Sequence, residues 1–418
     1  MMQTRKRWTI NRYDIGMFLL LLFGFVYGGL SRYIYPSQVV RISTLVIGLL
    51  FVVAGRYFRI NEQKIVSYVW LLTILVVLYN NQNIARGNYL FEIPYIIFVI
   101  AFLFLRQSSN WMIPAFKITA FFGTFYAFFT VLFRFMPSLY TNYIVKLFPE
   151  NIDFLIRMYN QGGGAGLTQH FSTNGIYVAI GVGTSFATLL YAKNGQKAAL
   201  EMLFFLMALL FTGKRAHIIF SFLAALYVYY VYKSDKPKGR LMKMIFIVGT
   251  LVGAVFLVGQ VFPGLLSFVD RFSSAAEQGD VSKGRFGRVA LAMTWYQQNK
   301  LLGIGWDGFK YAYIDYINVH NIYAQLLCEV GILGSLVFFG LFILNLMHAT
   351  IAFYRERKYF KKHNDEKGLL LTFSLFIQVF FLLYGVTGNP LYDFQMLIPY
   401  VLSCAIGEYY YYGKSTGQ

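Results

Sequence analysis

The sequence predicts an all-α fold, a polytopic integral membrane protein with about 12 transmembrane helices. Hydrophobic residues make up 57% of the 418 residues and charged residues only 13%, whereas roughly a quarter of the residues in a soluble globular domain are charged. Apolar runs also recur along the whole length, and about 20 mostly apolar residues suffice for a bilayer-crossing helix. We therefore expect a single membrane domain over residues 1–418.

The predicted spans follow one another along the chain. Each is an apolar run near the length that a membrane-crossing helix needs, and the run at 93–105 is the shortest. The first run is long and no small-residue cleavage site follows "GLSRYIYP", so we expect it to stay as a span. The predicted spans lie at 15–34, 42–58, 66–80, 93–105, 118–135, 175–191, 198–212, 218–232, 244–262, 327–350, 368–386 and 396–412.

Basic residues predict the orientation of these spans. The chain carries 37 Lys and Arg against 18 Asp and Glu. This excess would also suit a nucleic-acid partner, but its densest segments share one side of the predicted membrane, as the positive-inside rule describes for cytoplasmic loops. They are "TRKR" near the start, "KSDKPKGRLMK" at 233–243 and "RERKYFKKHNDEK" at 355–367. We therefore expect a multi-pass protein of the cytoplasmic membrane, with both termini cytoplasmic and no nucleic-acid partner.

Two predicted extracytoplasmic loops, at about 136–174 and about 263–326, are longer than the other connections. Long loops in compact proteins are usually functional or disordered. Both loops contain aromatic and apolar residues, such as Trp295 and Trp306 in the second loop, which separates the ninth and tenth spans. The stretch "RFGRVALAMTWYQQN" also has helical spacing. We expect both loops to form short helices that lie on the membrane surface.

The sequence lacks the common motifs for metal and cofactor chemistry. "TGKRAH" has Arg215 where a phosphate-binding loop needs Ser or Thr, and "GGGAG" at 162–166 follows no predicted strand. No His/Cys cluster has zinc spacing, and no outer loop offers an Asp-x-Asp pair. Cys328 and Cys404 both fall in predicted spans, where we expect small apolar packing residues. We therefore expect no metal and no cofactor.

Several ionisable residues share the predicted outer side. A guanidinium group holds phosphate through a planar, bidentate fork and stays charged, whereas a histidine can accept a proton near neutral pH. Such a set suits the binding of an anion next to a proton acceptor. The residues are Lys214, Arg215 and His217 in "GKRAH", Lys283, Arg285 and Arg288 in "KGRFGR", and His320 at the start of the tenth span.

Each of these residues also has a purely structural interpretation. Lys214 and Arg215 can extend from a span end to the lipid headgroups. Arg285 and Arg288 can be solvated loop charges, and His320 can satisfy backbone groups at a helix start. Position in the sequence alone does not decide between these alternatives.

Two stretches carry a family resemblance. "GRFGRVALAMTWYQQNKLLGIGWDGF" followed by "VHNIYAQLLCEVGILGSLVFFG" resembles the signature region of the bacterial O-antigen ligase and polymerase superfamily. Gly284–Arg285 matches the family's Gly-Arg pair, and "KLLGIG" at 300–305 matches its turn. "FTGKRAHIIFSFLAAL" places Arg215 on a family arginine. The final motif matches at His320, Asn321, Tyr323, Gln325, Glu329, Gly331 and Gly334.

The resemblance is weaker at some positions. "GLTQHFSTNG", which contains His170, resembles a less specific family segment. Lys300 stands where the family usually has proline, and Lys214 replaces a small residue. Arg288 competes with Arg285 for the position of the family's loop arginine, although the spacing to the turn favours Arg285.

The resemblance implies an inverting, metal-independent glycosyltransferase that works outside the cytoplasm. Its donor would be a glycan on undecaprenyl pyrophosphate, and its acceptor a sugar hydroxyl. Arg215 and Arg285 would offset the charge of the leaving pyrophosphate, and His320 would orient or deprotonate the acceptor hydroxyl. The predicted substrate-binding residues are Arg288, Lys214, Asn321, Tyr323, Gln325 and His170.

Several functions remain open at this stage. The abundance of Tyr, Phe and Lys suggests a low-GC Gram-positive source, which favours a polymerase of capsular or exopolysaccharide repeat units over an O-antigen ligase. A protein O-glycan transferase is a further alternative in the same family. A flippase or another transporter is the alternative from a different class, although most spans lack interior charges and no repeat is visible. A polymerase would work with a growing polysaccharide, the lipid bilayer, a chain-length regulator and a flippase.

Overall fold

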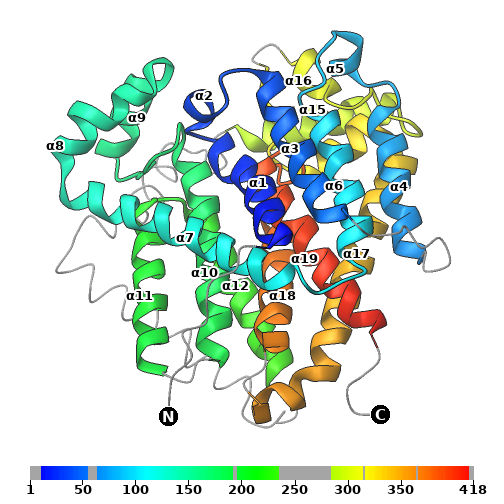
Figure 1. Ribbon diagram of the computed structural model, residues 1–418. Coiled ribbons are helices and arrows are strands. Elements are labelled where there is room, and N and C mark those ends of the chain that lie inside the picture. Colours follow the sequence, from blue (N-terminus) through cyan, green and yellow to red (C-terminus); the bar gives the residue numbers. More distant parts are fainter. Residues whose placement is uncertain are drawn as a thin grey trace, which may run out of the picture.

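The computed structural model of the protein describes residues 11–54, 64–191, 195–234, 284–313, 316–363 and 366–413. Within these ranges, all regular secondary structure is helical (Figure 1). The first helices are α1 (Arg12–Tyr27), α2 (Ser31–Ile34), α3 (Gln38–Val53), α4 (Ile65–Leu78), α5 (Gln82–Ala85), α6 (Glu92–Leu105) and α7 (Met112–Phe135). After these come α8 (Pro137–Leu139), three short π or 3₁₀ segments within 140–151, and α9 (Ile152–Asn160). The remaining helices are α10 (Phe171–Tyr191), α11 (Gly195–Phe211), α12 (Arg215–Tyr232), α15 (Arg285–Gln298), α16 (Gly308–Ala312), α17 (Ile322–His363), α18 (Glu366–Gly385) and α19 (Phe394–Tyr412).

Six helical segments of the described chain are long and apolar enough to cross a membrane. α3 and α6 are shorter apolar helices. The predicted all-helical class is confirmed and agrees with a polytopic membrane protein, whereas the number of about 12 spans and the single domain stay predictions. The predicted span at 244–262 and Lys283 lie outside the described residues. The six segments are Ile65–Ala85, Met112–Phe135, Phe171–Tyr191, Arg215–Tyr232, Ile322–Arg357 and Glu366–Gly385.

The first predicted span, at 15–34, is interrupted. α1 ends at Tyr27, and α2 begins only at Ser31. The backbone between them lies directly against another segment, because a Cβ atom on Gly29 would be 2.4 Å from the carbonyl oxygen of Leu167. This close approach requires glycine and ends the helix earlier than the apolar run does.

α10, α18 and α19 lie in the middle of the bundle (Figure 1). In α10 and α18, 78% of the most apolar stretch is buried, against 28% in α12, so α12 lies further outward. A helix that is apolar all round fits such a central position. Cys328 and Cys404 are buried free thiols, as expected for packing residues.

α17 contains a sharp kink, and the turn that follows α15 packs against the helix at this kink. Gly331 has a positive φ of 64°, and the backbone N–H of Ile332 donates to the carbonyl of Lys300 at 2.8 Å. A Cβ atom on Gly331 would be 2.3 Å from the carbonyl oxygen of Leu301, and one on Gly303 would be 2.4 Å from that of Glu329. The glycines of "LLGIG" and "EVGILG" therefore allow two backbones to touch. The contact holds the α15–α16 segment at the end of the bundle where α17 begins (Figure 1).

Candidate active site

His320 lies directly before α17 in an unusual backbone conformation. Its φ is 59°, in the left-handed region that non-glycine residues rarely adopt outside functional or strained sites. Asn321 caps the helix, since its Oδ1 accepts a hydrogen bond from the backbone N–H of Ala324 at 3.0 Å. The capping role therefore belongs to Asn321, and the half-buried imidazole of His320 is not needed for it.

The surroundings of His320 keep its ring neutral. Burial lowers its pKa to about 4, and the charges of Arg288, Arg285, Lys214 and His170 contribute in the same direction. A neutral imidazole near pH 7 has a lone pair available to accept a proton. The same interactions show that Lys214, Arg285 and Arg288, which the sequence predicts to share one side of the membrane, lie close enough to His320 to affect it.

Two arginines approach this histidine from the start of α15. Gly284, with a φ of 75°, precedes the helix, and Arg285 and Arg288 lie one turn apart on it. Burial lowers the pKa of Arg285, with further contributions from the charges of Arg288 and Arg215. An arginine nevertheless stays protonated in a protein. Arg215, the first residue of α12, belongs to the same positively charged group, because its charge acts on Arg285.

His170 lies in an aromatic stack next to Lys214. Its ring centroid is 5.0 Å from that of Phe154 on α9 and 4.6 Å from that of Phe171 at the start of α10. The Nζ of Lys214 lies 5.1 Å from the ring centroid of Phe171. Nδ1 of His170 accepts a hydrogen bond from the backbone N–H of Ser172 at 3.0 Å, so Nε2 carries the proton of the neutral ring. Burial lowers the pKa of His170 to about 4, and the charge of Lys214 contributes.

His217 occupies the space beside Gly175 of α10. A Cβ atom at Gly175 would lie 2.4 Å from Nδ1 of His217, so "FSTNG" ends in a glycine that admits this ring. The imidazole is fully buried, and its centroid is 4.9 Å from that of Tyr384 on α18. Within the described part of the chain, neither ring nitrogen of His217 has a hydrogen-bond partner. His217 is therefore a buried polar group that the sequence placed on the outer surface.

Asp393 is a site residue that the sequence did not indicate. It precedes α19 and accepts a hydrogen bond from the hydroxyl of Tyr384 at Oδ2, at 2.9 Å. Burial raises the pKa of Asp393 to about 6, while the Tyr384 hydrogen bond and the charge of Lys214 act in the opposite direction. The position of this acid in the short "GNPLYDF" connection before the last span is the one sequence signal that could have found it.

Three side chains that the sequence predicts to bind substrate form hydrogen bonds within the protein. The Tyr323 hydroxyl donates to the carbonyl of Leu382 at 2.7 Å, and the Asn321 amide donates to that of Val386 at 3.2 Å. Gln325 is fully buried and donates to Glu329 at 3.1 Å. These contacts position the start of α17, and a direct substrate contact of the three residues stays a prediction.

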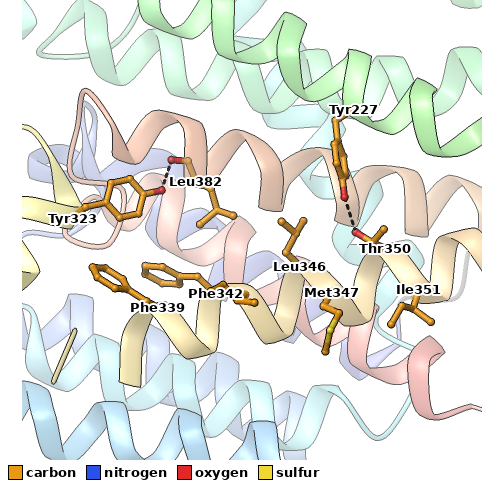
Figure 2. A pocket seen from close by; sticks show the side chains of 10 residues that line it. Tyr227, Tyr323, Phe339, Phe342, Leu346, Met347, Thr350, Ile351 and Leu382 are labelled. Carbon is orange, nitrogen blue, oxygen red and sulfur yellow. Dashed lines mark hydrogen bonds between the residues drawn. The ribbon is translucent and has the colours of Figure 1, made fainter. Parts of the chain in front are cut away.

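An apolar groove begins near this cluster and runs along α17 (Figure 2). It has a volume of about 660 Å³. Tyr323 lies at one end, and at the other end the hydroxyls of Tyr227 and Thr350 are 3.2 Å apart (Figure 2). Its lining residues on α12, α17 and α18 are Tyr227, Tyr323, Phe339, Phe342, Ile343, Leu346, Met347, Thr350, Ile351 and Leu382.

The assembled site can hold an anion next to a neutral base. Positive charge comes from Lys214, Arg215, Arg285 and Arg288, and the base is His320. The described residues contain no group of three or more His, Cys, Asp or Glu side chains placed to hold a metal ion. The absence of a metal requirement stays a prediction.

Comparison with known families adds one finding. Residues 200–339 match the model of a family described as O-antigen ligase. The match covers Arg215, Arg285, Arg288 and His320, but neither His170 nor Asp393. No curated protein matches the chain. The resemblance to the O-antigen ligase and polymerase superfamily is thereby confirmed.

Proposed function

We propose that this chain, whose residues 200–339 match the O-antigen ligase family, is a membrane glycosyltransferase that polymerises polysaccharide repeat units. It would transfer a glycan from undecaprenyl pyrophosphate to a sugar hydroxyl of a growing polysaccharide, at the outer face of the cytoplasmic membrane. The observation that carries the proposal is that Lys214, Arg285 and Arg288 lie near the neutral ring of His320, with Arg215 near Arg285.

The positive residues fit a pyrophosphate leaving group. As the bond from the anomeric carbon to the pyrophosphate breaks, its electron pair moves to the phosphate oxygen and negative charge grows there. Arg215 and Arg285 would stabilise this charge through bidentate hydrogen bonds. Because guanidinium groups are permanently charged, they can do this work without a metal ion.

His320 fits the acceptor side of the reaction. The acceptor hydroxyl attacks the anomeric carbon from the face opposite the leaving group, which inverts that carbon, and its proton passes to the imidazole. Burial, together with the neighbouring cations, keeps His320 neutral in the free protein. A bound pyrophosphate would offset their charge, so the histidine becomes a stronger base when the donor is in place.

The apolar groove fits the lipid part of such a donor. Tyr323, at one end of the groove, follows His320 by only three residues, so a lipid tail in the groove would place its pyrophosphate near the arginines (Figure 2). A chain of isoprene units has no polar groups, which suits a groove lined by aromatic and aliphatic side chains.

Transfer can be tested with the purified protein in lipid nanodiscs and a lipid-linked repeat unit. We expect longer glycans and free undecaprenyl pyrophosphate, with activity that survives EDTA. Movement of the lipid-linked unit across the bilayer without a new glycosidic bond would instead identify a flippase. Transfer to lipopolysaccharide core but not to repeat units would identify a ligase.

A further inference from the structure

Glu329 is a fully buried acid that the proposed mechanism does not use. Its Oε2 accepts a hydrogen bond from the backbone N–H of Asp307 at 3.0 Å, and its Oε1 accepts one from that of Phe309 at 3.2 Å. The amide of Gln325 donates to Oε1 at 3.1 Å, and the hydroxyl of Tyr392 donates to Oε2. One carboxylate thus receives donors from three separate segments of the chain.

The first segment is the connection that carries α15. The two backbone donors, Asp307 and Phe309, lie between α15 and the middle of α16. Next to them, the backbone N–H of Gly305 donates to the carbonyl of Glu329 at 2.8 Å. Arg285 and Arg288 are carried by the helix that this connection ties to α17.

The second segment ends at His320. The Gln325 amide that donates to Glu329 also donates to Oδ1 of Asn318 at 3.2 Å, and its oxygen accepts from the backbone N–H of Val319 at 3.3 Å. Val319 is fully buried and immediately precedes His320. Gln325 therefore fixes the chain at the point where the backbone takes its left-handed turn.

The third segment precedes α19. Tyr392 stacks on Trp306 of the α15–α16 connection, with 4.5 Å between ring centroids, and is followed directly by Asp393. The hydroxyl of Tyr392 binds the same carboxylate that holds the other two segments.

We propose that Glu329 is a positioning residue, whose carboxylate sets the arginines of α15, His320 and Asp393 in one relative placement. The inference rests on the proposed function, because these are the groups assigned to transfer. Two fixed backbone N–H donors, one on each oxygen, require both oxygens to accept. A glutamine amide has a single acceptor oxygen, so Glu329→Gln sets an NH₂ group against a backbone N–H.

The placement can be measured without substrate. Spin labels on α15 at Phe286, which is 79% exposed, and on α17 at Leu336, which is 60% exposed, report the distance between the two helices. We expect Glu329→Gln to shift or broaden this distance distribution. Glu408→Gln is the matched control, since Glu408 is equally buried near the other end of α17, where it contacts His348. It should leave the distribution unchanged.

Kinetics separate positioning from simple stabilisation. We expect Glu329→Gln to lower kcat by about 10²-fold at saturating donor, because misplacement of about 1 Å can have such an effect. Gln325→Leu releases the histidine segment but leaves both backbone donors on Glu329, so it should lower kcat with little change in KM and leave the spin-label distance unaltered. The Gln325→Leu variant also tests the positioning of His320 if Glu329→Gln does not fold.

Full kcat in Glu329→Gln, or lost kcat with an unchanged distance, would overturn the proposal. A wild-type protein without transfer activity would refute the proposed function, while the distance measurement would still test Glu329.

Discussion

Ionisable side chains gather at both ends of α17, but they are arranged differently. In the C-terminal half of α17, Glu356 forms ion pairs with Lys367 at 2.7 Å and with Arg355 at 3.2 Å, and His348 contacts Glu408. At the N-terminal end, the charges that act on His320 come from arginines, a lysine and another histidine.

This difference distinguishes ion pairs that stabilise the fold from a group of like charges that serves a reaction. Opposite charges in contact satisfy each other and hold helices together, whereas like charges brought together raise the free energy of the folded protein. A protein that retains such a cluster usually has a use for it, and perturbed pKa values mark functional sites for this reason. The group around His320 therefore suits the binding of an anion, whereas in the C-terminal half of α17 the acids Glu356 and Glu408 each already contact a basic side chain.

Replacement of His320 or His348, one histidine from each region, should give the largest difference in transfer activity. We expect His320→Asn to reduce transfer by about 10²–10⁴-fold, because asparagine keeps hydrogen bonding but cannot accept the proton. His348→Asn, the matched control, should lower the thermal midpoint and leave kcat per folded protein near normal. The transfer rate is measured with a radiolabelled glycan, and the thermal midpoint is taken from a melting curve. Normal chain length from His320→Asn would assign that residue to structure alone.

Arginine replacement at the two ends should have the next largest effect. Arg285→Lys keeps the charge but loses the bidentate fork, so we expect a fall in kcat of about 10–10²-fold, below the effect of complete loss of an anion-stabilising donor. Arg355→Lys, at the opposite end, should change kcat little. Equal losses in both variants would show that the fork at Arg285 has no special role.

Filling the groove should affect the lipid rather than the chemistry. Leu346→Trp places a larger side chain in the groove, and we expect KM for the undecaprenyl-linked donor to rise by about tenfold, as for a misfit in an apolar pocket. Leu336→Trp is the control on the same helix, at a position that does not line the groove. A donor with a short isoprenoid chain should be less sensitive to Leu346→Trp. Equal sensitivity of both donors would place the lipid elsewhere.

The smallest expected effect concerns pH. His320 must be neutral to accept a proton, and its pKa in the free protein is about 4, so it should not limit kcat/KM until the pH falls near that value. Asp393 has a pKa of about 6, so a requirement for its ionised form would lower kcat/KM below pH 6. We expect this few-fold decline in the wild type and its loss in Asp393→Asn. An unchanged decline in the variant would exclude Asp393 as its source.

The sequence predicts those parts of the protein that have a local pattern. Apolar runs indicate helices such as α7 and α18, because length and hydrophobicity are local properties. They do not indicate the break after Tyr27, which depends on contact with Leu167, far away in the chain. The orientation in the membrane stays a prediction, as does the location of the long loops outside the cytoplasm.

The candidate site divides in the same way. Arg215, Arg285 and His320 lie in motifs with recognisable spacing, and the structure brings them together. Asp393 and Tyr384 have no such motif, since their importance arises only when α18 packs against α10, α12 and α19. Glu329 was visible in the motif, but its hydrogen bonds to three segments follow from the kink at Gly331 and from the fold around it.

Four helices begin at or next to the positively charged and histidine residues of the candidate site. α10 begins just after His170, α12 begins at Arg215, α15 at Arg285, and α17 two residues after His320. The aligned peptide dipoles of a helix place about half a positive charge at its N-terminus. This charge belongs to the backbone, so it neither titrates nor disappears when a side chain is replaced. Variants that lack one arginine should therefore retain weak affinity for inorganic pyrophosphate across the pH range, even where transfer is lost.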